Sequence, residues 1–170
     1  MNYNTSILTM SMIALILSGP AMAGITIQCP NLSQAKQLVD CPADAEMERY
    51  FKKQCDFERD PDAKKPELCD SFKEYKRRKF NAMWESSDGE FMGYLSCDAP
   101  PAELKKRQQT SVAVSQKNGL YKVVCGYEGG SRLIMRTRSV CRVPGVKTTG
   151  IVMRAECGAN GKPCVVECDE

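Results

Sequence analysis

The residues best suited to chemistry in this chain are its ten cysteines, which all follow an apolar N-terminal stretch, while histidine is absent. Thiols can form disulfides, ligate a metal or act as nucleophiles. No two cysteines have C-x-x-C spacing, and no histidine is present to complete a mixed zinc site or activate a thiol. We therefore expect disulfides, with no metal and no other cofactor. The metal alternative uses Cys157, Cys164 and Cys168, whose spacing is loosely compatible with thiolate ligation.

Acidic residues are the remaining candidates for acid–base catalysis. Glu85, Asp88 and Glu90 lie near Trp84 and Tyr94, whose rings could stack on a sugar. A carboxylate pair can hydrolyse a glycosidic bond when one acid has a raised pKa. The same acids are also typical of a solvated loop at a helix end, and a sole tryptophan is typical of a core. We expect no catalytic residues and keep a glycan-directed extracellular hydrolase as the alternative function.

Four arginines are the strongest candidates for binding. A segment expected to be a strand carries arginines only at even-numbered positions, which alternation places on one face: Arg132, Arg136, Arg138 and Arg142. Lys122 lies on the preceding strand. Guanidinium groups form forked hydrogen bonds with anionic groups. These residues therefore predict a surface for an anionic partner: an unidentified protein, or an anionic glycan or surface. The alternative is the ordinary solvent face of an antiparallel sheet, where basic side chains guard against aggregation.

Charge is distributed unevenly along the chain. Residues 24–100 contain 12 Lys or Arg against 15 Asp or Glu, a net of −3, whereas residues 101–170 contain 12 against 6, a net of +6. The basic run from Lys73 to Lys79 surrounds more than one side of an expected helix and has no exposed aromatic partner beyond Tyr75. We interpret it as a solvated helix surface and expect no nucleic-acid partner.

The N-terminus is typical of a cleaved export signal. Residues 7–19 are largely apolar, and Ala21-Met22-Ala23 fits the small-x-small rule for cleavage after Ala23, although the first six residues contain no Lys or Arg. The apolar run is shorter than the roughly 20 residues of a membrane span. We expect residues 1–23 to be a signal peptide and the mature protein to be secreted or periplasmic, with no transmembrane segment.

The first half of the mature chain has helical periodicity. Apolar residues spaced by three and four predict helices over residues 43–58 and 67–86, joined by a charged linker, after a short strand over residues 25–29. A short linker makes the helices antiparallel neighbours. Cys55 and Cys69 then lie at the same end of the helical hairpin, and we predict that they are bonded.

The second half alternates as strands do. Lys117-Asn118-Gly119 predicts a turn, and keeping Cys125 and Leu133 on one surface requires an odd-length loop near residues 128–130. Asn160-Gly161 favours a two-residue hairpin loop, which sets Cys157 directly opposite Cys164. We predict a cross-strand disulfide between these two cysteines.

The sequence thus predicts a disulfide-rich α+β protein, with an N-terminal helical hairpin packed against a C-terminal antiparallel sheet of about four strands. Residues 24–100 form the helical half and residues 101–170 the β half, together one compact domain over 24–170. We expect an exported binding protein that acts without catalysis.

Overall fold

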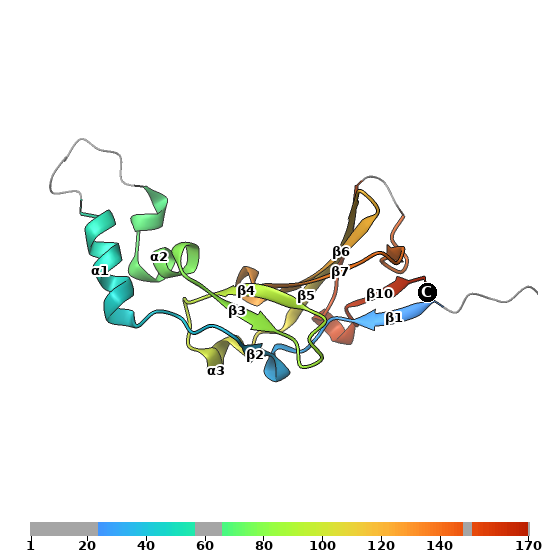
Figure 1. The fold of residues 1–170 in the computed structure, drawn as a ribbon, viewed down its shortest axis with the longest axis horizontal. Coiled ribbons are helices and arrows are strands. Elements are labelled where there is room, and N and C mark those ends of the chain that lie inside the picture. The colour runs from blue at the N-terminus through green and yellow to red at the C-terminus, as the bar shows by residue number, and fades with distance from the viewer. Residues whose placement is uncertain (1–23, 57–65, 148–150, 170) are drawn as a thin grey trace, which may run out of the picture.

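The computed structural model describes residues 24–56, 66–147 and 151–169, so the expected signal peptide lies outside the described residues. The described chain is mostly β, with its two longer helices at one end (Figure 1). The helices are α1 (Asp44–Gln54), α2 (Phe72–Lys79) and α3 (Pro101–Leu104). The strands are β1 (Ile25–Gln28), β2 (Lys36–Gln37), β3 (Asn81–Glu85), β4 (Met92–Ser96), β5 (Gln109–Lys117), β6 (Leu120–Tyr127), β7 (Arg132–Thr137), β8 (Cys141–Arg142), β9 (Val152–Glu156) and β10 (Val165–Cys168).

The strands form two antiparallel sheets. Seven make one sheet in the order β2-β3-β4-β7-β6-β5-β9, and three make a second in the order β1-β10-β8. Strands from the first half of the chain belong to both sheets, since β1 pairs with β10 and β4 pairs with β7. The expected C-terminal sheet of about four strands is therefore wrong: the larger sheet draws three of its seven strands from before residue 100.

Alternation along the long strands divides the larger sheet into a buried and an open side. Val112, Val114, Val123, Cys125 and Leu133 are buried, and the register pairs Val112 and Leu133 with Cys125 on the shared strand β6. These side chains join the core together with residues of the second sheet. Because successive side chains point to opposite faces, the intervening residues of β5, β6 and β7 form the other side.

The expected second helix is too long. It ends at Lys79, after which Asn81–Glu85 form β3, with Ala82 and Trp84 buried and Trp84 opposite Gly93 on β4. The apolar residues that suggest a helix here also fit the alternating pattern of a β-strand. Pairing with β4 makes the segment a strand. The helix also begins later than expected, where the Ser71 hydroxyl caps it by accepting a hydrogen bond from the backbone N–H of Glu74.

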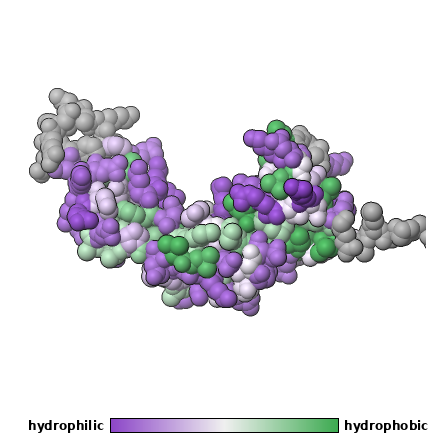
Figure 2. Space-filling model, viewed as in Figure 1, coloured by the Kyte–Doolittle hydropathy of each residue, from purple (hydrophilic) through white to green (hydrophobic). Residues whose placement is uncertain are grey.

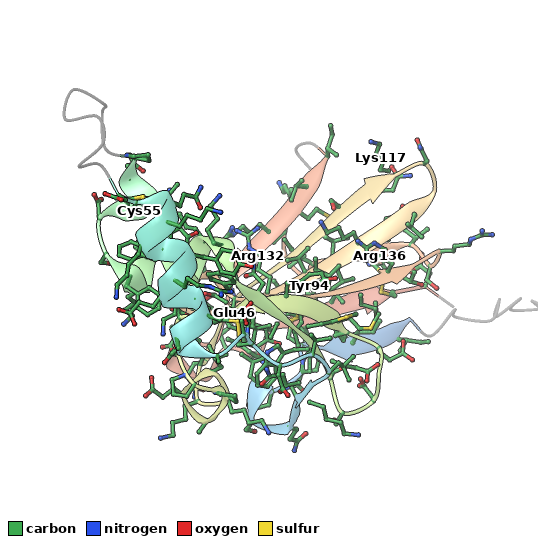
Figure 3. The ribbon with its side chains drawn as sticks, turned by 60° about the vertical axis from the view of Figure 1, so that its left-hand side comes forward. Glu46, Cys55, Tyr94, Lys117, Arg132 and Arg136 are labelled. Atoms are coloured by element: carbon green, nitrogen blue, oxygen red, sulfur yellow. A yellow bond between two sulfur atoms is a disulfide. The ribbon has the colours of Figure 1, made fainter. Side chains whose placement is uncertain are left out.

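Helices α1 and α2 form a small lobe beyond the sheet (Figure 1). Rings of Phe51, Phe72, Tyr75 and Phe80 pack on one another at centroid separations of 5.3 to 5.9 Å. The predicted bridge between Cys55 and Cys69 is present and closes the lobe opposite the sheet (Figure 3). The lobe replaces the larger helical hairpin that the sequence predicts.

Five disulfides account for all ten cysteines. They are Cys29–Cys125, Cys41–Cys97, Cys55–Cys69, Cys141–Cys168 and Cys157–Cys164. The three cysteines of the metal alternative all belong to these bridges. Multiple bridges fit an extracellular or periplasmic location, where disulfides persist.

The bridge between Cys157 and Cys164 is present, but the hairpin predicted around it is wrong. Strand β9 pairs with β5 in the larger sheet, whereas β10 pairs with β1 and β8 in the smaller one. The turn starts at Gly158, which has φ of +84° and whose N–H donates to the carbonyl oxygen of Lys162 at 2.7 Å. The bridge therefore joins the two sheets instead of two partner strands.

The loop between β6 and β7 has the predicted odd length. The backbone N–H of Tyr127 donates to the carbonyl oxygen of Ser131, leaving the three residues Glu128–Gly130 between them. Gly129 and Gly130 both have positive φ, which glycine adopts without strain. This register keeps Cys125 opposite Leu133 and so settles which side of β7 carries the arginines.

Candidate anion-binding face

The open side of the larger sheet, here called the outer face, brings together residues from five strands. Lys122 on β6 lies directly opposite Arg136 on β7, and Gly126 lies opposite Arg132. On β4, Met92 pairs with Ile134, so the antiparallel register carries Tyr94 to the level of Arg132. Figure 3 shows Tyr94, Arg132 and Arg136 on this side of the sheet. Three of the five residues predicted to bind an anion therefore share the strands of one face, and Arg138, directly after β7, lines a hollow with two of them.

The cations of the outer face are not neutralised by neighbours. Among the described residues, no carboxylate lies within ion-pairing distance of Lys122, Arg132, Arg136 or Arg138. Arg132, Arg136 and Arg138 are exposed and Lys122 is half-buried. Their like charges repel one another when no anion is present, so a bound anion relieves repulsion as well as adding contacts.

Arg138 lies just beyond the end of β7 and extends the basic surface towards the end of the β5–β6 hairpin. It lines an open hollow of about 960 Å³ with Lys117, Lys122, Arg136, Leu120 and Ile151. Of the described residues that line this hollow, none is acidic. The hollow thus brings together four cations, Lys117, Lys122, Arg136 and Arg138.

Arg142 does not join this group, which corrects the sequence prediction. The chain bends after β7, and Arg142 belongs to β8 of the smaller sheet. Its guanidinium pairs with Glu167 at 3.4 Å and with Asp169 at 3.2 Å. Parity arguments hold only along one continuous strand, and the bend at Arg138–Val140 interrupts it.

Three contributors to the outer face were not among the predicted binding residues. Met92 and Tyr94 are 43% and 68% exposed, which gives the basic surface an apolar and aromatic border. Arg154 on β9 donates to Glu156 and to the hydroxyl of Ser111, so its charge is partly matched. The alternation of Met92 and Tyr94 with buried Phe91 and Leu95 is the signal that could have identified β4.

The acidic residues considered for catalysis are arranged differently from a stacked sugar site. Trp84 is fully buried on the inner side of the sheet, whereas Tyr94 is exposed on the outer face, so the two rings do not face one ligand. Asp88 accepts hydrogen bonds from the Ser86 hydroxyl and the Glu90 N–H, and these bonds lower the pKa of its carboxyl group. A general acid needs the opposite shift.

No described helix combines the length and apolar character needed to cross a bilayer. The chain matches no protein-family model, no curated protein and no solved structure.

Proposed function

We propose that this protein is an exported, disulfide-braced binding protein whose outer face holds an anionic partner without chemical turnover. The observation that carries the proposal is the set of cations on this face, Lys122, Arg132, Arg136 and Arg138, which have no acidic partner among the described residues. Elsewhere in the described chain some cations are paired, as Lys76 is with Asp44 and Arg107 is with Asp98.

The fold supports this use because the face is held in place before any partner arrives. Cys125 lies towards the C-terminal end of β6 and is bridged to Cys29, which anchors the strand that carries Lys122. A preorganised surface loses less conformational entropy on binding than a mobile one. Guanidinium groups on a fixed sheet then keep a constant spacing from one another, and each can form a forked hydrogen bond with an anionic group.

The test uses the oxidised mature protein, residues 24–170, on immobilised heparin, a sulfated polysaccharide that serves as an anionic probe. We expect retention that moderate salt does not abolish. In Arg132→Glu/Arg136→Glu, both residues lose their contacts and introduce repulsion, so affinity falls by at least about tenfold.

Lys105→Glu/Lys106→Glu is the matched control, because it changes net charge equally at two residues beside α3, away from the outer face. It is expected to retain most of the binding. Equal losses in both double variants would mean that heparin senses net charge alone, and would dismiss the outer face as a site.

A further inference from the structure

The end of the β5–β6 hairpin projects from the body of the molecule together with the start of β9 (Figure 1). Asn118 and Gly119 make its tight turn with φ values of +53° and +74°. Lys117 lies at the tip of the hairpin (Figure 3). A two-residue turn of this kind holds the flanking side chains in fixed positions.

Exposed aliphatic side chains gather at this end. Leu120, Ile151 and Val152 are 41%, 80% and 55% exposed. Leu120 is on β6 and Val152 on β9, the two strands that flank β5, and Ile151 directly precedes β9. Leu120 and Ile151 line the same hollow, and Val152 is paired with Ser115 beside it. Figure 2 shows green apolar and purple polar surface side by side on this projecting arm. Grouped exposed aliphatic residues mark an interaction surface.

Cations surround the aliphatic group. Lys117, Lys122, Arg136 and Arg138 line the hollow, and none of them has an acidic partner among the described residues. Their long aliphatic stems can lie along apolar surface while the charged ends extend outward. The arm therefore has an apolar end with a basic border, on a rigid support.

We propose that this arm docks on an anionic lipid bilayer, with Leu120, Ile151 and Val152 entering the interface and the four cations contacting lipid headgroups. The inference rests on the proposed function and names its partner. An acidic polysaccharide would use the cations but would gain little from three aliphatic side chains. An anionic bilayer uses both, since interfacial binding combines apolar burial with attraction to charged headgroups.

The experiment measures co-sedimentation of the oxidised mature protein with vesicles of equimolar phosphatidylglycerol and phosphatidylcholine, and with phosphatidylcholine alone. Wild type is expected to bind the anionic vesicles and not the neutral ones. Leu120→Ser/Ile151→Ser is expected to weaken that binding by about tenfold or more, because apolar burial is lost while charge is kept. The same variant is expected to keep wild-type retention on heparin, which also shows that it is folded.

Leu38→Ser/Val39→Ser is the matched control, since these two side chains are 49% and 56% exposed but follow β2 at the opposite edge of the larger sheet. It is expected to bind vesicles as wild type does. A second reporter is Leu120→Trp, because the chain's one tryptophan, Trp84, is fully buried. Its added emission is expected to shift to shorter wavelength when anionic vesicles are present.

Each other outcome has a definite meaning. Vesicle binding that is unchanged in Leu120→Ser/Ile151→Ser would overturn insertion and leave charge alone. Retention on heparin without vesicle binding would overturn the lipid partner and favour an acidic glycan, with the proposed function intact. Failure on both heparin and vesicles would overturn the proposed function as well.

Discussion

Gly93 shows how a missing side chain positions the outer face. A Cβ atom built there would lie 2.2 Å from the backbone oxygen of Arg132, a separation that atoms do not tolerate. Glycine therefore permits β4 to approach β7 closely enough for Met92 to pair with Ile134. This approach places the exposed ring of Tyr94 at the level of Arg132.

We predict that Gly93→Ala destabilises the protein by about 1 to 3 kcal/mol, because backbone atoms of two strands must move apart. It should also weaken heparin retention, since Tyr94 and Arg132 lose their alignment. Urea unfolding measures the first effect and elution salt the second. Tyr94→Ala is the control for stability, because an exposed side chain contributes little. Wild-type stability in Gly93→Ala would contradict the close approach.

The sequence predicts which side of the sheet a side chain lies on wherever the strand is continuous. The parity of Arg132 and Arg136 follows from alternation, and the odd-length loop before them fixes their side of the sheet. The position of Arg142 was not predictable in this way, because the bend after β7 breaks the count. Gly93 carried no signal, since its role depends on a strand distant in sequence.

Among the elements, α2 depends on a charge network at its surface. Glu74 accepts hydrogen bonds from the guanidinium groups of Arg77 and Arg78, one helical turn away. These bonds lower the pKa of Glu74 from 4.5 to about 2. The carboxylate is thus ionised in the folded state at pH values where it is already protonated in the unfolded chain.

This shift predicts a pH dependence with a definite sign. Because the folded pKa lies below the unfolded value, the stabilisation is complete above about pH 4.5 and is lost as the pH falls towards 2. We expect Glu74→Gln to be less stable than wild type at neutral pH and to match it only once the pH is below about 2. Urea unfolding followed by circular dichroism across this range measures the difference. A difference that stays constant with pH would exclude the Glu74 carboxylate as its source.

Element type was harder to predict where helix and strand patterns overlap. The segment from Phe80 to Glu85 fits both periods, and the partner strand β4 decides its structure. The bridge between Cys55 and Cys69 could still be predicted, because it needs only that both ends of a short linker lie close together. The hairpin expected around Asn160 failed because Gly158 directs the chain into the second sheet.

At the scale of the whole molecule, the disulfides form two nested sets. Cys29–Cys125 encloses Cys41–Cys97, which encloses Cys55–Cys69, and Cys141–Cys168 encloses Cys157–Cys164. The outer bridge spans 96 residues, whereas Cys157–Cys164 spans 7. Longer loops lose more entropy in the unfolded chain when they are closed.

We therefore predict that Cys29→Ala/Cys125→Ala lowers the free energy of unfolding by about 4 to 5 kcal/mol, and Cys157→Ala/Cys164→Ala by about 2 kcal/mol. Loss of packing at Cys125, which is fully buried, adds to the first value. Chemical denaturation of wild type and both variants under non-reducing conditions measures the two losses in the free energy of unfolding. A larger loss in Cys157→Ala/Cys164→Ala would show that joining the two sheets matters more than loop length.

The nested order of the disulfides also affects how they form as the protein matures. Cys29 and Cys41 precede their partners Cys125 and Cys97 by 96 and 56 residues, so we expect an oxidant to reach these two thiols before their partners are available and to join some of them wrongly. Reaching the native set then requires thiol–disulfide exchange. Maturation of this protein is therefore expected to depend on a disulfide isomerase and to proceed over seconds to hours, much more slowly than the pairing of its hairpins.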